Sequence, residues 1–290
     1  MSKKLFYMFL LLSSQLVIAS EILLVSSHGQ GGGIHKHALQ VQTLLTEWLN
    51  EPVILEFKPG GNGIVGTQYV RARVSTKPTF MIGALQYEFA MDQSQDIVPV
   101  VELGVLNPVI YASPKLGVKS WSELIGSRQS VSYGVPIGGP LIYMDGLAKH
   151  LQHQIQLREV SYKSSGQMTT DVIGGHLDLG TGTPNVIAPL AATDKVIPLL
   201  VLGNRRSSVL PNIPCIADLG IAFPNDRYKF RTMLWASPST DVNVIESIRR
   251  NYIRWVTSAE GQRVLDSLDY DIPSKQGLTQ PADMIKKLVR

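Results

Sequence analysis

The chain has 290 residues, of which 44% are hydrophobic and 17% are charged, an ordinary balance for a globular protein large enough for two domains. Its 27 basic residues barely exceed its 23 acidic ones and form no Lys/Arg block, which argues against a nucleic-acid partner. The single cysteine, Cys215, excludes an internal disulfide, and we expect a buried or half-buried loop thiol there.

Residues 1–19 are predicted to be a secretory signal peptide. Lys3 and Lys4 precede an apolar run, and the segment ends at Ala19, a small residue that suits cleavage after it. The alternative is a membrane anchor, but polar residues 13–15 interrupt a run that falls short of the roughly 18–20 residues a span needs. Cleavage would remove two lysines from the 27 basic residues and leave 25 against 23 acidic ones, a net charge of +2. The sequence therefore predicts export to the periplasm.

A glycine-rich loop follows the first predicted strand, residues 22–25, and opens a helix that reaches Leu49. The first N–H groups of a helix lack partners within it, and the helix dipole is positive at that end. We therefore interpret Gly31, Gly32, Gly33 and Ile34 as a cradle for a carboxylate or phosphate, the alternative being a plain flexible loop. Ile34 replaces the third glycine of a dinucleotide fingerprint, and no P-loop motif is present.

Strands and helices then alternate along the chain. Strands are predicted at residues 53–57, 80–83, 98–105 and 109–112, with a turn-rich stretch at 58–63 and a helix at 64–73. Gln86, shortly after the third strand, is a candidate ligand residue.

A second strand, glycine loop and helix follow a capping box at Ser120 and Glu123. The strand covers residues 131–134, and the helix begins near Leu141. The loop supplies a second group of candidate ligand residues: Ile137, Gly138, Gly139, Pro140 and Leu141. Two such cradles on separate lobes could close on one ligand from both sides.

The remainder continues the alternation. We expect a strand ending at Tyr162, a helix over 167–173, strands over 177–180, 196–202 and 233–236, a helix from Thr183 to about 192, and closing helices near 241–257, 259–268 and 281–289. This order favours an α/β fold with parallel sheets in two lobes, and ligands in such folds bind at the carboxyl ends of strands. The expected domains are residues 20–113 plus 231–290 and residues 114–230, with crossings near 112–116 and 228–232.

Short motifs in a shared order resemble the Bug family of extracytoplasmic solute receptors, the substrate-binding proteins of tripartite tricarboxylate transporters. Each is weak alone, but together they span more than two hundred residues. They are Gly31-Gly32, Pro59-Gly60-Gly61-Asn62-Gly63, Tyr133-Gly134, Val160-Ser161-Tyr162-Lys163, Gly174-Gly175, and Arg206 followed by Leu210-Pro211-Asn212-Ile213-Pro214.

The resemblance implies the periplasmic binding protein type II fold, with two α/β domains around a ligand cleft. It also implies a small carboxylate ligand held by loops 28–35 and 135–141, membrane transporter subunits as partners, no cofactor, and a monomer. The sequence departs from the family pattern, because Gly29 and Gln30 stand where the family has prolines and His35 stands where it has Asp. The loss of acids makes the site less negative, which suits an anion.

Several candidate residues have two interpretations. His28, His35 and His37 could bind a metal, but no cysteine or acid lies near them in the sequence, and we predict no metal site. His35 is instead a ligand residue, a helix-start contact or a solvated side chain. Tyr162 either lines the cleft or packs half-buried. Three residues at the turn between the predicted strand 177–180 and the following helix either contact the ligand or cap that helix. They are Thr181, Thr183 and Asn185.

These patterns predict a periplasmic receptor that captures a small organic anion without transforming it and delivers it to a membrane transporter. One alternative is a sensory receptor that signals to a membrane kinase. Another is a secreted hydrolase, but no G-x-S-x-G motif and no readable pair of carboxylates is present, so we do not expect an enzyme.

Overall fold

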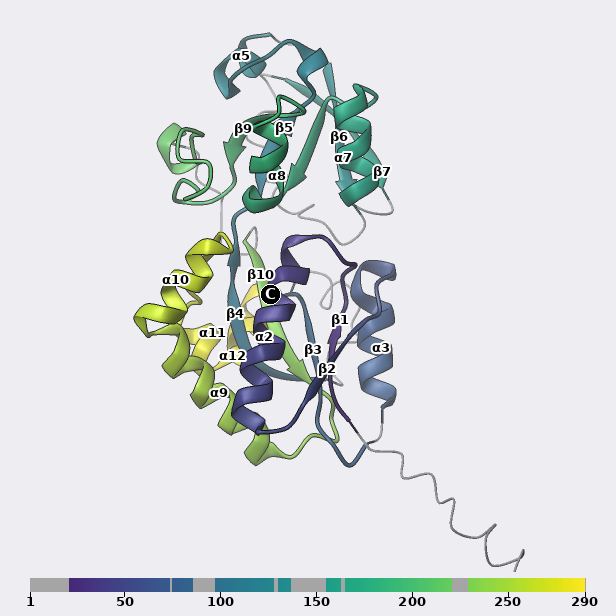
Figure 1. Ribbon diagram of the computed structural model, residues 1–290, viewed down its shortest axis with the longest axis vertical. Helices are drawn as coiled ribbons and strands as arrows, with labels where there is room; N and C mark the ends of the chain where they lie inside the picture. Colours follow the sequence, from purple (N-terminus) through teal and green to yellow (C-terminus); the bar gives the residue numbers. More distant parts are fainter. Residues whose placement is uncertain are drawn as a thin grey trace, which may run out of the picture.

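The computed structural model describes residues 21–289 except 74, 86–96, 128–129, 137–154, 163–164 and 221–228 (Figure 1). The predicted signal peptide, Gln86 and the second glycine loop therefore lie outside the described residues. The described chain forms two lobes, each built on its own β-sheet. The described residues within 21–106 and 230–289 form lobe 1, and the described residues within 109–220 form lobe 2.

Lobe 1 has a six-stranded sheet in the order β11-β4-β10-β3-β1-β2. Its elements are β1 (Ile22–Ser26), α2 (Gly33–Leu49), β2 (Val53–Phe57), α3 (Ile64–Ala72), β3 (Thr79–Ala84), β4 (Val98–Leu106), β10 (Phe230–Ala236), α9 (Val242–Val256), α10 (Ala259–Ser267), β11 (Tyr270–Asp271), α11 (Lys275–Thr279) and α12 (Pro281–Val289).

Lobe 2 has a five-stranded sheet in the order β7-β6-β8-β5-β9. Its elements are β5 (Val109–Ala112), α5 (Trp121–Gly126), β6 (Ser130–Pro136), β7 (Gln156–Tyr162), α7 (Ser165–Gly174), β8 (Leu179–Gly182), α8 (Pro184–Ala191) and β9 (Ile197–Val201).

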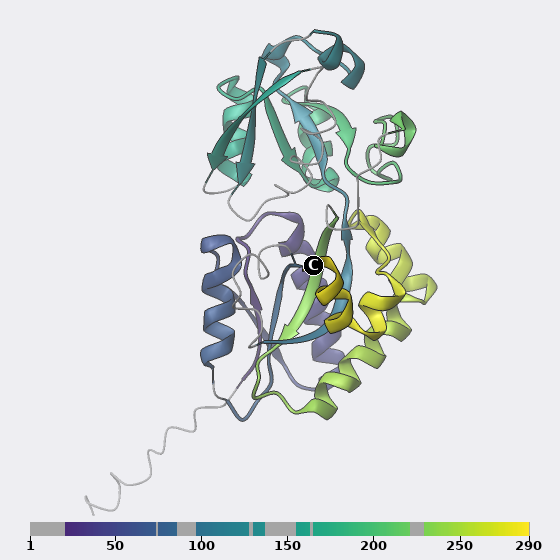
Figure 2. The same cartoon turned by 180° about the vertical axis from the view of Figure 1, so that it is seen from behind.

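Side chains of the lobe 1 strands alternate between two cores. Leu24, Phe80 and Leu234 pack on the face covered by α2 and α9 (Figure 1). Met81 and Trp235 pack on the opposite face, against α3 and α12 (Figure 2). Because both faces of the sheet are covered, these strands are continuous apolar runs. Such runs could be recognised as strands from the sequence.

Both sheets are mixed, so the expectation of purely parallel sheets is wrong. β1 pairs in parallel with β2 and β3, but β10 runs antiparallel to β3 and β4. In lobe 2, β5 runs antiparallel to β8 and β9, whereas β6 runs parallel to β7 and β8. The cause is the exchange of chain between lobes. β10 and β5 each enter a lobe from the other lobe, so they run away from the boundary between the lobes. Their partners β3, β4, β8 and β9 run toward that boundary, which makes these pairs antiparallel.

The first crossing between the lobes lies at Asn107 and Pro108, earlier than the predicted 112–116. β5 directly follows these two residues and pairs only within the lobe 2 sheet. β4 and β5 are both largely apolar, so composition does not show that they belong to different sheets. Asn107 N–H donates to the Asp269 carbonyl of lobe 1, and Leu202 N–H donates to the Pro108 carbonyl from the lobe 2 side.

The motif that begins at Arg206 braces a loop of lobe 2. Arg206 Nε donates to Asp218 Oδ2 at 2.8 Å, and its Nη1 donates to the Pro211 carbonyl at 3.2 Å. The Cys215 N–H donates to the same Asp218 oxygen at 2.9 Å, and this bond together with Arg206 lowers the pKa of Asp218. The Cys215 thiol is buried and free, which confirms the predicted loop thiol.

The lengths and hydropathy of the described helices bear on membrane insertion. None of them is both long enough and apolar enough to cross a membrane.

Candidate functional site

Strand direction places several loops at the boundary between the lobes. β4 runs out of lobe 1 toward lobe 2, and β1, β2 and β3 share its direction. Their carboxyl ends therefore face lobe 2. β5 runs away from lobe 1, so β6, β7, β8 and β9 run back toward it. Both segments that lead into the predicted glycine cradles, β1 and β6, thus end at the same boundary.

Hydrogen bonds fix the exit from β1. Ser26 Oγ donates to the His28 carbonyl at 2.9 Å, and Ser27 N–H donates to the Ile82 carbonyl of β3 at 3.1 Å. The His28 ring nitrogen Nδ1 lies 3.1 Å from Ser27 Oγ. The chain consequently leaves the sheet in a defined direction before the glycines begin.

The glycines that follow border open space. A Cβ built on Gly29, Gly31 or Gly32 meets no atom within 4 Å, and Gly31 has a φ of +90°, where glycine is favoured. α2 begins at Gly33 after Gly32 as N-cap, and no side chain caps it. No side chain of the described residues therefore occupies the backbone N–H groups at the start of this helix, a position that suits an anion.

His35 folds back onto this loop. Gly31 N–H donates to His35 Nδ1 at 3.0 Å, so this ring nitrogen accepts a hydrogen bond from the loop backbone. The ring also meets Phe57 of β2 edge-on, with centroids 5.1 Å apart. Of the three interpretations from sequence, this geometry matches the helix-start contact.

The turn after β8 approaches from lobe 2. Thr183 is the N-cap of α8, with Pro184 at the first helical position, as the sequence predicts. Its hydroxyl donates to Asn185 Oδ1 at 3.1 Å and accepts no hydrogen bond from the helix, so α8 also begins without a side-chain cap. Thr181 is buried within β8.

The starts of α2 and α8 touch. A Cβ built on Gly33 would lie 2.2 Å from Thr183 Cγ2 and 3.2 Å from Thr183 Cβ. Glycine is therefore the residue that lets lobe 2 approach α2 this closely. Figure 1 shows the start of α2 at the edge of lobe 1 that faces α8. The structure thus brings predicted site residues of the two lobes together, with Gly33 of lobe 1 against Thr183 of lobe 2.

Tyr162 has its polar end engaged within lobe 2. Its hydroxyl donates to Asp171 Oδ2 of α7 at 2.9 Å, and its ring packs with Met168 and Val172. Burial raises the pKa of Tyr162 to about 12, and the Asp171 carboxylate adds to the effect. This arrangement matches the packing interpretation of Tyr162.

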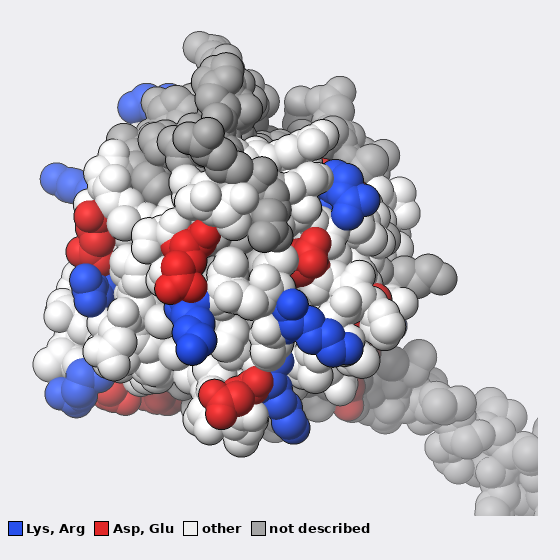
Figure 3. Space-filling model, turned by 90° about the horizontal axis from the view of Figure 1, so that it is seen from above, with Lys and Arg blue, Asp and Glu red and all other residues white. Residues whose placement is uncertain are grey.

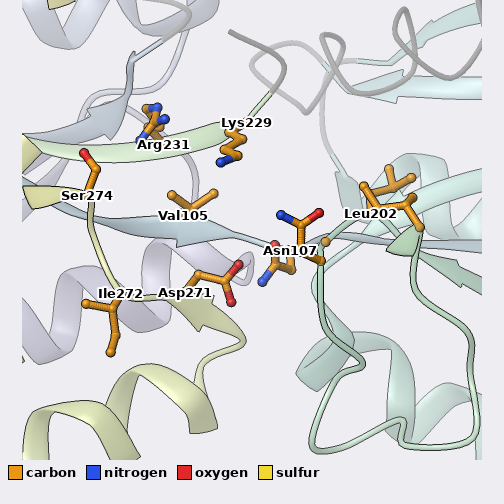
Figure 4. A pocket seen from close by; sticks show the side chains of 11 residues that line it. Val105, Asn107, Leu202, Lys229, Arg231, Asp271, Ile272 and Ser274 are labelled. Atoms are coloured by element: carbon orange, nitrogen blue, oxygen red, sulfur yellow. The ribbon is translucent and has the colours of Figure 1, made fainter. Parts of the chain in front are cut away.

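A cavity of about 200 Å³ at the crossings was not predicted (Figure 4). Lys229 and Asp271 reach into it from two walls, and Asn107 lines it beside the first crossing. Its residues come from positions between Val105 and Ser274, so no local motif could have located it.

Two ion pairs join distant segments near this cavity. Arg231 Nη1 pairs with Glu102 Oε1, and both side chains are buried. Ser274 N–H and Oγ donate to the second Glu102 oxygen at 3.2 and 2.9 Å. Arg205 Nε pairs with Asp271 Oδ1 at 2.6 Å. The charges on the cavity wall are thus largely compensated, which makes this cavity a poorer anion site than the uncapped loop.

The histidines form no metal site within the described chain, where no three His, Cys, Asp or Glu side chains gather closely enough to hold an ion. His37 is fully buried, with its ring centroid 4.3 Å from that of Tyr270. Acidic and basic side chains are interspersed over the described part of the lobe 2 end (Figure 3), as the balanced composition predicts.

Two α/β lobes joined by crossing strands, with strand ends and uncapped helix starts at their shared boundary, define the class of two-lobed periplasmic solute-binding proteins. The chain belongs to the tripartite tricarboxylate transporter family receptor family, TctC, whose model matches residues 38–280. The resemblance noted in the sequence is thereby confirmed. Members of this family are periplasmic transport receptors and not enzymes.

Relatives and solved structures agree with this assignment. The chain is 23% identical over 243 residues to a UPF0065 protein of Bordetella bronchiseptica, covering 79% of this chain and 71% of that protein. It is 22% identical over 235 residues to protein BugT of Bordetella pertussis, covering 76% and 72%. The same fold occurs in MatC of Rhodopseudomonas palustris with bound malate, with a TM-score of 0.74, 16% identity and coverage of 93% of this chain and 96% of that one. It also occurs in another protein of that organism with adipate, with a TM-score of 0.78, 19% identity and 93% coverage of each chain.

Proposed function

We propose that this protein is a periplasmic receptor that binds a small carboxylate between its lobes and delivers it to the membrane subunits of a tripartite tricarboxylate-type transporter. The uncapped start of α2 beside open space carries the proposal. Its backbone N–H groups suit a carboxylate, and strand direction turns them toward lobe 2.

The comparisons support a carboxylate as the ligand class. Malate and adipate, which the two structural neighbours carry, are both dicarboxylates. In this chain the first loop has no acidic side chain between Ser26 and Glu47, so nothing on that segment would repel a second carboxylate. The candidate residues of the second loop, 137–141, and Gln86 complete the proposed site.

Titration calorimetry against malate, adipate, citrate and benzoate tests the proposal, with a neutral sugar as the control. We expect at least one acid to bind and to be recovered unchanged after incubation. Binding of the sugar but of none of the acids would refute the carboxylate ligand, and chemical turnover of a bound acid would refute a receptor without catalytic activity.

A further inference from the structure

The start of α8 rests on two residues of lobe 1 that are far apart in the sequence. One is Gly33, whose missing side chain leaves room for the Thr183 methyl group. The other is Asp269, between α10 and β11, whose carboxylate faces the Asn185 N–H in the first turn of α8. Both contacts therefore join lobe 1 to the first turn of α8 in lobe 2.

Asp269 is held in an unusual way. Its side chain is only 1% exposed, and its φ of +60° places it in the left-handed region. Its carbonyl accepts from the Asn107 N–H at the first crossing, so its position is coupled to the hinge. Neither carboxylate oxygen makes a well-formed hydrogen bond within the described chain, although Ser207 and Asn185 lie close by.

A buried carboxylate without well-formed hydrogen bonds is costly for the fold. Its place opposite the positive end of α8 offsets part of that cost, because a helix start attracts negative charge. Moving lobe 2 away would expose the carboxylate to water and remove it from the helix start. Asp269 therefore differs in its surroundings between an open and a closed arrangement of the lobes.

We propose that Gly33 and Asp269 are positioning residues that set the closed arrangement of the two lobes by receiving the first turn of α8. Gly33 supplies the space, and Asp269 supplies a buried carboxyl that favours the closed arrangement in its protonated form. The inference deepens the proposed receptor function, since closure over a ligand is what the contact would control, but its test needs no ligand.

The charge of Asp269 makes the contact depend on pH. Burial is the main cause that raises the pKa of Asp269 to about 6, with Asp266 adding to it and the Ser207 hydroxyl, Arg205 and the Asn185 N–H opposing it. The other ionisable groups packed around it are Asp271, paired with Arg205, and Tyr270, which stacks on the neutral His37. Protonation favours the buried form. The contact should be strongest below the ordinary aspartate pKa of about 3.8 and should weaken as pH rises through about 6.

The first test is Gly33→Ala in the ligand-free protein, followed by small-angle X-ray scattering. The added methyl should hold the lobes apart and increase the radius of gyration. The circular dichroism spectrum should stay unchanged, because alanine favours a helix more than glycine does and α2 is retained. Gly126→Ala in α5 is the matched control, since its Cβ meets no atom within 4 Å. The double variant Gly33→Ala, Thr183→Ser removes the clashing methyl and should restore the wild-type radius.

The second test is Asp269→Asn, which keeps the shape and tolerates the positive φ but carries no charge. The wild-type radius of gyration should decrease from pH 7.5 to pH 5 with a midpoint near the pKa of about 6, and the variant should show no such change. Equal radii for the Gly33 and Gly126 variants, or the same pH profile in Asp269→Asn as in wild type, would overturn the proposal. Failure of every carboxylate to bind would refute the receptor function but leave these results unaffected.

Discussion

At the scale of single residues, the buried pair of Glu102 and Arg231 joins β4 to the strand that returns from lobe 2. Glu102 is completely buried and also accepts two hydrogen bonds from Ser274, at the start of α11. A Cβ on Gly277 would lie 1.7 Å from Glu102 Oε2, which explains the glycine in that short helix. One carboxylate thus holds three segments of lobe 1 together.

Arg231→Leu should destabilise the protein strongly. The substitution leaves the Glu102 charge buried without its cation, a change that typically costs about 3–5 kcal/mol. The free energy of urea unfolding measures it. Lys286→Ala is the matched control, because the Lys286–Asp283 pair is exposed and such pairs contribute about 0–1 kcal/mol. Similar losses in both variants would contradict this role for the buried pair.

His37 should make the fold sensitive to acid. Burial lowers its pKa from 6.5 to about 3, so below pH 6.5 the unfolded state binds a proton that the folded state does not. This destabilisation is absent above pH 6.5 and grows as pH falls toward 3, reaching about 3 kcal/mol at pH 4.

His37→Leu removes this titration, so the variant should lose about 3 kcal/mol less stability than wild type between pH 7 and pH 4. Urea unfolding of both proteins at the two pH values measures the difference. Parallel losses would show that His37 does not titrate as its burial requires. Asp269 is present in both proteins and cancels in the comparison.

At the scale of elements, the first loop and α2 form the part of the site that sequence reasoning located best. The glycines, the helix start and the preceding strand all occupy consecutive positions, so a local pattern contains the whole feature. The same holds for Thr183 and Pro184 at the start of α8. Gly33 was predicted as a ligand residue. Its contact with Thr183 was not predicted, because the two residues are 150 positions apart and no local pattern links them.

Other elements show where sequence reasoning fails. The two-residue strand β11 and the short helix α11 are too brief for a periodic pattern, and both were missed. The antiparallel course of β10 was missed because an apolar run gives no direction. Asp269 was missed because nothing in the local sequence marks this aspartate as buried.

Gly32→Val should abolish carboxylate binding and preserve the fold. Gly32 borders open space, and its φ of −91° and ψ of −179° are angles that valine also adopts. The valine side chain would therefore fill only the room that the ligand needs. Calorimetry with the acid that binds wild type measures the loss, and circular dichroism checks the fold.

His35→Ala should weaken binding less than Gly32→Val, because it removes a single hydrogen bond to Gly31, worth about 1 kcal/mol. Full affinity in Gly32→Val together with complete loss in His35→Ala would shift recognition from the backbone to the side chain.

At the scale of the whole molecule, Arg205 fastens the loop after β9 to lobe 1. It follows β9 of lobe 2, yet its guanidinium bonds Asp271 at 2.6 Å, Asp266 at 2.8 Å and the Tyr270 carbonyl at 3.1 Å. The neighbouring Arg206 bonds only Asp218 and Pro211, within lobe 2. Two adjacent arginines therefore perform different tasks, one between the lobes and one inside a lobe.

Arg205→Ala should loosen the arrangement of the lobes and increase the radius of gyration, because three bonds to lobe 1 disappear together. Arg206→Ala should leave the radius unchanged and lower only the stability of lobe 2. Scattering on both variants separates the two effects. An unchanged radius in Arg205→Ala would show that the arrangement of the lobes does not depend on the bonds of Arg205.

The place of β10 in the lobe 1 sheet sets an order for folding. β10 lies between β3 and β4, yet it is reached only after the whole of lobe 2 has been traversed. Before residue 230 emerges, lobe 1 is two separate fragments with unpaired strand edges, whereas the lobe 2 sheet already has all its strands. Lobe 1 therefore cannot complete its sheet until the last part of the chain has been made, and its first strands keep unpaired edges until then.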